Sequence, residues 1–388
     1  MSAPASGPVG FVGWTTALGI KDEAPDFTTV LSTGPAVVAA VFTRSRFAGP
    51  SVLLSRDSAA KGSARGVAVI SRNANVATGA EGLANAREVR ELVAARAGVA
   101  PEEVLIASTG VIGRQYPMDR VRAGLAAQPG PESMPPADIP AAAAAIMTTD
   151  TVAKHVALRC GGATIAAIAK GVGMIEPNMA TLLTFFFTDA ELDHPTLDRV
   201  FRRVVDRTFN ALSIDTDTST SDSAAIFANG QAGPVDEAEF EQVLYQAALT
   251  LVRAIASDGE GASKLIEVRV LGARDDAQAK RVAKAIVNSP LVKTAVHGAD
   301  PNWGRVAMAV GKCEDELDID PTKVVIRFGD VETYPAASTD EVLAAATEQM
   351  RGDEVVITVE LGIAGGTFTV YGCDLTDGYI RINADYTT

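Results

Sequence analysis

The segment Lys170–Phe187, which reads KGVGMIEPNMATLLTFFF, constrains the fold of this 388-residue chain more than any other stretch. A glycine-containing turn opens it, and Pro177 lacks a backbone donor and disfavours a helix at the residue before it. The phenylalanine-rich run that follows has apolar residues on both faces, which predicts a buried strand. Thr181 therefore stands at the mouth of a core strand, directly after the small residue Ala180.

This position suits a self-cleaving threonine. The hydroxyl of such a threonine can attack the carbonyl of a small preceding residue, and hydrolysis of the resulting ester makes the threonine a new N-terminus. Its α-amine, with an ordinary pKa of about 7.7–8.0, can then serve as general base for its own hydroxyl. Taken alone, the pair Ala180-Thr181 also fits an ordinary loop threonine that opens a strand.

Composition narrows the classes of protein that the chain can represent. Apolar residues make up 47% of the 388 residues, which allows two or three domains with a large core. No apolar run reaches the roughly 18–20 residues of a membrane span, and the N-terminus lacks a secretory pattern, so we expect a cytoplasmic protein. With a net charge of −14 and 5% aromatic residues, we expect no nucleic-acid partner.

The cysteines and histidines show no spacing typical of a metal or redox site. Gly171 and Gly173 do not form a dinucleotide fingerprint, since Glu176 stands where the third glycine would be. We therefore expect no metal and no cofactor, and we expect the thiols to be buried and free. The cysteines and histidines are Cys160, Cys313, Cys373, His155, His194 and His297.

Three loops carry polar residues directly after regular elements. A strand over Glu103–Ala107 runs into Ser108–Gly113, whose backbone N–H groups suit an oxyanion, although a plain turn explains STGVIG more simply. A short helix over Ala141–Thr151 ends in threonine hydroxyls that can also be mere caps. An amphipathic helix over Asp236–Ser257 ends in DGEGASK, where two glycines either free the backbone around Glu260 or form a surface loop.

Other segments flank the phenylalanine run. Val156–Ala169 reads as a strand that ends at Lys170, which is either a solvated strand end or a site residue. Thr188–Glu191 reads as a capping box that opens a helix to about Ala211. For Asp215–Asp222 we prefer a hydroxyl-rich turn to a cation site.

Together these motifs resemble those of the ornithine acetyltransferase family. KGVGMIEPNMAT is similar to the family's cleavage-site signature, and Asp258–Lys264 and Lys293–Arg305 are similar to its DGEGA(T/S)K and KTAxxGxDPNWGR segments. The resemblance runs from about residue 7 to residue 388. It implies an α/β fold: a layered αββα-type sandwich of mixed sheets with a second, smaller α/β domain, similar to N-terminal-nucleophile proteins.

The resemblance also implies a processed and assembled protein. Cleavage between Ala180 and Thr181 would give an α-chain of residues 1–180 and a β-chain of residues 181–388. The β-chain would include a C-terminal α/β domain over about residues 265–388. The two chains would remain associated, as α2β2 or a larger assembly.

The activity implied is transfer of the acetyl group from N2-acetylornithine to glutamate, in a ping-pong scheme through acetyl-Thr181. For the threonine that contacts substrate, Thr148 is the first choice and Thr149 the alternative, because the loop before Lys170 varies in length. The resemblance assigns Thr181 as nucleophile, Thr109 and Gly110 as oxyanion hole, and Thr148, Lys170, Thr181, Glu260, Asn383 and Thr388 as substrate-binding residues.

Two other classes of protein stay open. N-terminal-nucleophile amidohydrolases and aminopeptidases share the cleavage logic but use water to release the acyl group. A non-catalytic amino-acid-binding protein would keep an intact chain. Ile70–Asn73 departs from the family's usual Asn-Ser-Gly-Asn, and the composition resembles that of actinobacterial proteins, in which a second copy can serve secondary metabolism.

Overall fold

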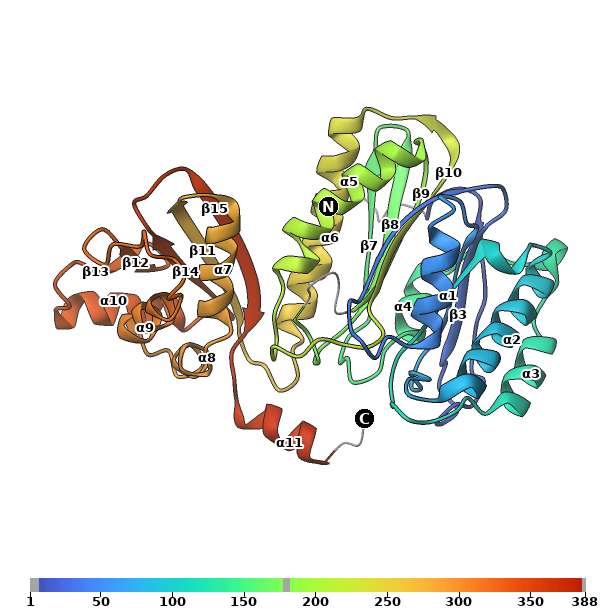
Figure 1. Cartoon of the computed structure of the whole chain (residues 1–388), viewed down its shortest axis with the longest axis horizontal. Coiled ribbons are helices and arrows are strands. Elements are labelled where there is room, and N and C mark those ends of the chain that lie inside the picture. Colours follow the sequence, from blue (N-terminus) through green and yellow to red (C-terminus); the bar gives the residue numbers. More distant parts are fainter. Residues whose placement is uncertain (1–6, 177–181, 386–388) are drawn as a thin grey trace.

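The computed structural model describes residues 7–176 and 182–385. Strands β1 to β15 form three mixed sheets, and helices cover or separate them (Figure 1). The expected α/β fold with layered mixed sheets is confirmed. The division into two chains and a C-terminal domain stays a prediction.

The first sheet has the order β1-β3-β5-β6, with β2 paired to β3. Helices α2 and α3 cover its outer face, where Phe27, Ile70 and Val89 share one apolar cluster. A strand-rich N-terminal stretch therefore supplies one wall of the molecule. The elements are β1 (Phe11–Val12), β2 (Thr15–Thr16), β3 (Phe27–Ser32), β5 (Gly66–Ile70), β6 (Val104–Ser108), α2 (Gly79–Ala97), α3 (Met118–Ala126) and short 3-10 helices at Pro101–Glu103 and Pro131–Ser133.

The second sheet has the order β4-β10-β9-β8-β7, and the phenylalanine run forms β9 near its centre. Phe186 points into the cluster under α5 and α6, whereas Phe185 and Phe187 point into the cluster between the first two sheets. Burial of both faces confirms the predicted core strand. The elements are β4 (Val37–Phe42), β7 (Lys154–Cys160), β8 (Ala163–Lys170), β9 (Leu183–Glu191), β10 (Ser223–Pro234), α5 (His194–Arg207), α6 (Glu237–Ser257) and a 3-10 helix at Phe209–Ala211.

Two short helices connect the sheets of this double layer. Helix α1 (Pro50–Ala59) packs on β6 and β4, and α4 (Ile139–Ala145) packs on β8 and β3. Each helix thus contacts strands of both sheets, which fixes the sheets relative to one another.

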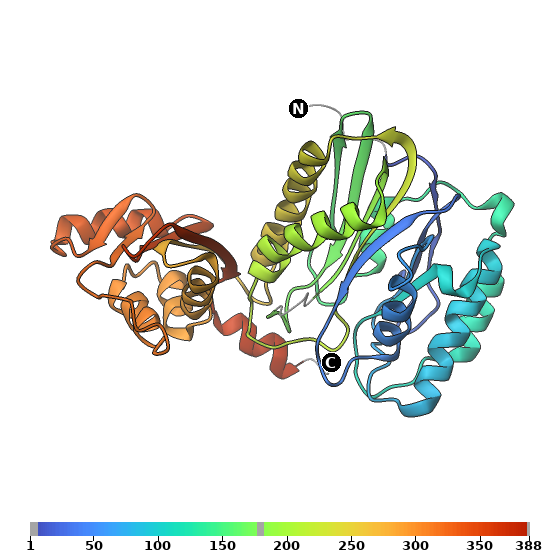
Figure 2. The same ribbon diagram turned by 45° about the horizontal axis from the view of Figure 1, so that its top comes forward.

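The third sheet, with the order β13-β12-β14-β11-β15, lies beside this double layer in Figures 1 and 2. After β15 the chain turns back, and both views show α11 extending from the third sheet toward the double layer. This return brings the C-terminal segment near the ends of the central strands. The elements are β11 (Leu265–Ala273), β12 (Val325–Phe328), β13 (Val331–Tyr334), β14 (Glu354–Glu360), β15 (Gly366–Cys373), α7 (Asp276–Val287), α8 (Pro290–His297), α9 (Trp303–Gly311), α10 (Asp340–Met350) and α11 (Asp377–Asp385).

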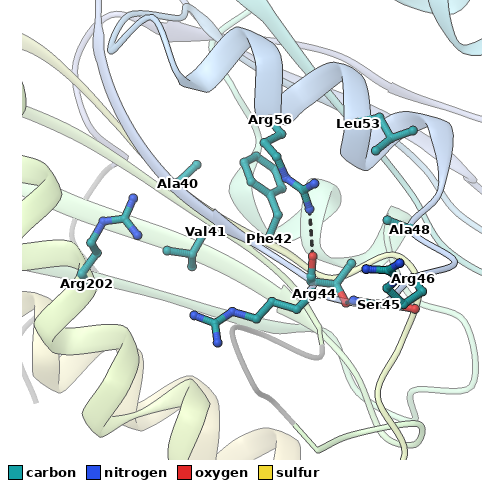
Figure 3. A pocket seen from close by; sticks show the side chains of 11 residues that line it. Ala40, Val41, Phe42, Arg44, Ser45, Arg46, Ala48, Leu53, Arg56 and Arg202 are labelled. Atoms are coloured by element: carbon teal, nitrogen blue, oxygen red, sulfur yellow. Dashed lines mark hydrogen bonds between the residues drawn. The ribbon is translucent and has the colours of Figure 1, made fainter.

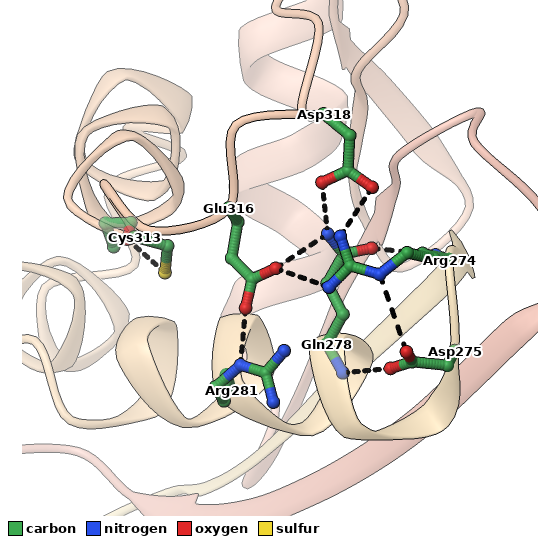
Figure 4. Close-up of polar contacts among 8 residues, drawn as sticks. Arg274, Asp275, Gln278, Arg281, Cys313, Glu316 and Asp318 are labelled. Carbon is green, nitrogen blue, oxygen red and sulfur yellow. Dashed lines mark hydrogen bonds and ion pairs between the residues drawn. The ribbon is translucent and has the colours of Figure 1, made fainter.

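A polar network fastens the connection after α9 to helix α7 (Figure 4). Glu316 accepts hydrogen bonds from Arg281, from Gln278 Nε2 at 2.9 Å and from Arg274 at 2.9 Å. The hydrogen bond from Arg281, the largest influence, holds the pKa of Glu316 at about 2. Asp318 accepts from Gln278 and Arg274, each at 2.7 Å. The network is structural and lies outside the candidate site described below.

Two sequence predictions near the central strands are wrong in detail. Val156–Ala169 is two antiparallel strands, because Gly161 adopts a φ of +55° and lets the chain reverse. The supposed capping box at Thr188–Glu191 instead continues β9, and Asp193 caps α5 by accepting from Thr196 N at 2.8 Å. Pairing with β10 extends the strand past the local helix signal.

Candidate active site

A cavity of about 120 Å³, called the central cavity, lies where β6 and β8 end. Six of the residues predicted for the site line it, namely Thr109, Gly110, Thr148, Lys170, Glu260 and Asn383. Its other lining residues are Ala74, Ile112, Thr149, Gly173, Met174, Ser219, Thr220 and Ser221. The predicted Ala180, Thr181 and Thr388 lie outside the described residues.

The loop after β6 presents two donors to the cavity. The N–H of Thr109 donates to Ile70 O at 3.0 Å, so this amide is not available to a ligand. The donor that Thr109 offers to the cavity is therefore its hydroxyl. Gly110 has a φ of +124°, and a Cβ there would lie 2.3 Å from the carbonyl carbon of Arg72, so the position requires glycine. In the described part of the chain, no hydrogen bond uses the Gly110 N–H.

Lys170 stands at the end of β8 beside this loop. Its Nζ donates to Thr109 Oγ1 at 3.2 Å, which leaves the threonine hydroxyl hydrogen available to a substrate oxygen. Burial lowers the pKa of Lys170, and the nearby Asp150, Asp222 and Glu260 oppose that shift. A lysine with an easily lost proton suits both carboxylate binding and proton exchange.

A buried ionic network that was not predicted from the sequence lies next to Lys170. Lys154 lies between Asp150, at 2.8 Å, and Asp258, at 2.5 Å. Asp150 also accepts from the N–H of Gly171 at 2.8 Å. Burial raises the pKa of Asp150, but Lys170 and Lys154 outweigh it and the net shift is downward. The i,i+4 spacing of Asp150 and Lys154 is the one local signal for this network.

Glu260 reaches the cavity from the loop between α6 and β11, and both its oxygens have donors. Thr149 Oγ1 donates to Oε1 at 3.0 Å, and Asn383 Nδ2 donates to Oε2 at 2.9 Å. A Cβ at Gly173 would lie 2.5 Å from Oε2, so glycine makes room for the carboxylate. Thr148 and Thr149 both line the cavity, and only the Thr149 hydroxyl contacts Glu260 among the hydrogen bonds of the described residues.

The profile of the ArgJ family matches residues 13–388. The chain belongs to the ArgJ family. It is 64% identical over 387 residues to glutamate N-acetyltransferase Oat2 of Streptomyces clavuligerus, covering 98% of each chain. It is 56% identical over 387 residues to arginine biosynthesis bifunctional protein ArgJ of Rhodococcoides fascians, covering 99% of this chain and 95% of the relative.

Two solved ArgJ-type chains match part of the chain. The arginine biosynthesis bifunctional protein ArgJ of Bacillus halodurans is 40% identical with a TM-score of 0.48, over 51% of this chain and 96% of that chain. Ornithine acetyltransferase of Mycobacterium tuberculosis, solved with ornithine, is 34% identical with a TM-score of 0.39, over 45% of this chain and 94% of that chain.

In this ArgJ-family chain, hydrogen bonds to Asp215 fix the backbone of Met174 and Ile175, shortly before the predicted cleavage site. Asp215 accepts from the N–H groups of Met174 at 2.6 Å and Ile175 at 2.8 Å. Asp215 thus serves as a backbone anchor, and no cluster of metal-ligating side chains occurs among residues 7–176 and 182–385. Asp215 and Thr216 lie in a bend of the backbone, which agrees with the preferred interpretation of this segment as a turn.

Glu176, the last described residue before Pro177, has a similarly well-held side chain. Its carboxylate accepts from Ser213 Oγ at 2.6 Å and from Asn288 Nδ2 at 2.7 Å. Lys284 lies 3.7 Å away, and burial lowers the pKa of this lysine to about 8. These three partners come from distant segments, and no local pattern in the sequence predicts a role for them.

His297, singled out from the DPNWGR segment, does not line the central cavity. Its Nδ1 lies 3.0 Å from Asp374 Oδ2 and 3.3 Å from Ser263 Oγ. Because the serine and the aspartate approach the same ring nitrogen, the histidine cannot relay a proton between them as in a catalytic triad.

Across the described residues, no helix is long and apolar enough to cross a membrane.

Proposed function

We propose that this chain transfers the acetyl group of N2-acetylornithine to glutamate through acetyl-Thr181, after self-cleavage between Ala180 and Thr181. The supporting observation is the register of β8 and β9, in which Lys170 pairs with Leu183. Leu183 comes two residues after Thr181 in the sequence, and Lys170 donates a hydrogen bond to Thr109. The start of β9 therefore lies beside Lys170 and the donors of the loop after β6. Membership of the ArgJ family supports the acetyl-transfer activity.

In the first half-reaction the α-amine of Thr181 takes the proton of its hydroxyl, and Oγ attacks the acetyl carbonyl of N2-acetylornithine. The Thr109 hydroxyl and the Gly110 N–H stabilise the tetrahedral oxyanion, at about 2.7–4 kcal/mol per donor. The C–N bond then breaks, the leaving nitrogen takes the proton back, and ornithine departs. The acetyl group remains as an ester on Thr181.

In the second half-reaction the α-amine of glutamate attacks the ester carbonyl and the bond between that carbon and Oγ of Thr181 breaks. The proton that the amine loses passes to Oγ through the α-amine of Thr181, so the hydroxyl is restored and N-acetylglutamate departs. Both substrates share an α-amino acid end, so one pocket can hold that end and tolerate either tail. Lys170 is suited to a substrate carboxylate and Glu260 to an ammonium group. Glu260 would exchange contacts with Thr149 and Asn383 for substrate contacts.

Intact-mass spectrometry tests the proposal. The wild type should appear as fragments 1–180 and 181–388, and N-acetylornithine alone should add one acetyl mass to the second fragment. Glutamate should remove that mass faster than buffer does, with N-acetylglutamate as product. Thr181→Ala should stay intact and unlabelled, whereas Thr250→Ala, the control on the exposed face of α6, should still cleave and label.

The same experiment distinguishes the alternatives. Discharge by water as fast as by glutamate would assign the chain to the N-terminal-nucleophile hydrolases. An uncleaved wild type that binds ornithine without labelling would make it a binding protein. A label on a residue other than Thr181 would overturn the proposed nucleophile.

We further propose that the fragments act together in the cytoplasm, as α2β2 or a larger assembly. All three cysteines, Cys160, Cys313 and Cys373, are free thiols, as is usual in a reducing compartment. Light scattering on the cleaved protein tests the assembly, and a mass of one fragment pair would contradict it.

A further inference from the structure

A second pocket, of about 650 Å³, lies on the outer side of β4 between α1 and α5 (Figure 3). Four arginines line it, Arg44, Arg46, Arg56 and Arg202, and its lining contains no acidic residue. Figure 3 shows Arg44 and Arg202 extending from opposite sides of this arginine pocket. In a chain with a net charge of −14, such a local excess of positive charge is unusual.

Most of this charge is not neutralised by the protein. In the described part of the chain, neither Arg44 nor Arg46 makes a hydrogen bond or an ion pair. Arg56 donates to the carbonyl oxygen of Thr43 at 2.8 Å, which carries no full charge. Only Arg202 pairs with a carboxylate, that of Asp198 at 2.8 Å. Guanidinium groups without acidic partners are well suited to carboxylates and phosphates.

The backbone at the floor of the pocket offers further donors. β4 is an edge strand, and the N–H of Val38 points away from β10 to Gly62 O, at 3.1 Å. In an antiparallel pair every second residue has this orientation, so the N–H groups of Ala40 and Phe42 also point away from β10. Both residues line the arginine pocket.

Hydrogen bonds also connect the wall of the arginine pocket to the wall of the central cavity. Thr43 Oγ1 donates to Ser219 O at 2.7 Å, and the N–H of Gly49 donates to Thr220 O at 3.0 Å. Ser219 and Thr220 line the central cavity, while Arg56 holds Thr43 from the other side. A ligand that draws Arg56 away would loosen the anchor of this cavity wall.

We propose that the arginine pocket is an effector site for a small polyanion that carries at least two carboxylate or phosphate charges. Its volume suits a small molecule. A second copy of the chain docked on the same face would bring its own arginines against these, and the like charges would repel. Binding at this pocket is independent of the proposed function, whereas the effector role rests on it.

Calorimetric titration of the cleaved wild type at low ionic strength tests binding, with pyrophosphate, citrate and ADP as probes. At least one probe should bind with a sub-millimolar Kd, and Arg44→Gln with Arg46→Gln should weaken it at least tenfold. Neither side chain makes a hydrogen bond or an ion pair with the described residues, and both arginines are exposed, so this double variant should fold. The control, Arg87→Gln with Arg351→Gln, removes the same charge from exposed sites and should bind as the wild type does.

The outcomes separate the possibilities. Citrate binding alone would identify a carboxylate ligand, pyrophosphate or ADP binding alone a phosphate ligand. Absence of binding by every probe, or equal weakening in both double variants, would overturn the site. A saturating probe should change the KM or kcat of acetyl transfer at least twofold in the wild type and not in the Arg44/Arg46 variant. Unchanged turnover would overturn the effector role, and a chain without transferase activity would leave the calorimetric result standing.

Discussion

At the scale of single residues, Gly110 is the position on which the proposed oxyanion loop, Ser108–Gly113, depends most directly. Its φ of +124° and the closeness of the Arg72 backbone both exclude a side chain. Arg72 itself has a φ of +70°, so two unfavourable backbone conformations meet at this loop. The sheet ends hold them in place through bonds such as Thr109 N–H to Ile70 O.

Gly110→Ala should therefore lower the rate of acetyl-enzyme formation by about 10²-fold or more, because the N–H donor is displaced. It should also lower the free energy of unfolding by about 1–3 kcal/mol. Gly113→Ala is the matched control, since Gly113 has a φ of +80° but no atom within 4 Å of an added Cβ. Stopped-flow acetylation and urea unfolding measure the two effects. Equal loss of rate in both variants would reduce the role of Gly110 to backbone strain.

Lys284 predicts a pH dependence of stability. Its pKa of about 8 in the folded chain lies below the ordinary 10.5, because burial disfavours the charged form. Between these values the unfolded chain binds the proton more strongly, so the free energy of unfolding rises with pH from about 8 to 10.5. Below this window the lysine is charged in both states and the full cost of burying the charge remains.

The measurement compares two chains that both carry Thr181→Ala and so stay intact. From pH 8 to 10.5, the chain that retains Lys284 should gain at most about 3 kcal/mol relative to one with Lys284→Met. Other titrating groups cancel in this difference. A difference that stays constant across the window would mean that the Lys284 amine is solvated.

At the scale of elements, α11 depends on a close approach to the loop that bears Glu260. Gly261 has a φ of +69°, and a Cβ there would lie 2.3 Å from the N–H nitrogen of Tyr379. Thr376 Oγ1 donates to Gly261 O at 2.5 Å and fixes the start of the helix. Asn383, one turn after Tyr379, then reaches Glu260.

Gly261→Ala should push α11 away and withdraw Asn383, a proposed substrate-binding residue, from the site, which should raise the KM for both substrates about tenfold, the effect of one lost hydrogen bond to substrate. Gly79→Ala is its control, with a φ of +66° and no atom within 4 Å of the added Cβ. Steady-state kinetics and hydrogen exchange over residues 377–385 measure the change. An unchanged KM with faster exchange would show that α11 is not part of the substrate site.

At the scale of the whole molecule, the second sheet joins the two predicted fragments. In its order β4-β10-β9-β8-β7, the two strands that follow residue 181, β10 and β9, lie between strands that precede it, β4 on one side and β8 and β7 on the other. Six residue pairs join β4 to β10, and six join β8 to β9. The proposed cleavage would therefore cut the chain without opening the sheet.

The cleaved protein should elute as one species in native size-exclusion chromatography, at the volume of intact Thr181→Ala and with equal amounts of both fragments. The fragments should separate only in denaturant, because parting them exposes the core between the sheets. Fragment 181–388 expressed alone should not fold, since β9 would lose its neighbour β8. Separation in native buffer would contradict the shared sheet.

The sequence by itself determined much of this arrangement. The phenylalanine run predicts the buried strand β9 because both of its faces are apolar. Motifs resembling one family predicted that Thr109, Gly110, Lys170, Glu260 and Asn383 belong to one site, and the structure brings these five to one cavity. Such signals are readable because they lie within short, continuous stretches.

Only the tertiary structure decided the rest. Lys154 and Asp258 are 104 residues apart, and nothing near either predicts their ion pair. The extension of β9 to Glu191 overrode a local capping signal because β10 supplies backbone partners there. The arginine pocket likewise joins a loop, α1 and α5. Contacts of this kind follow from sheet register and helix packing, which local periodicity does not encode.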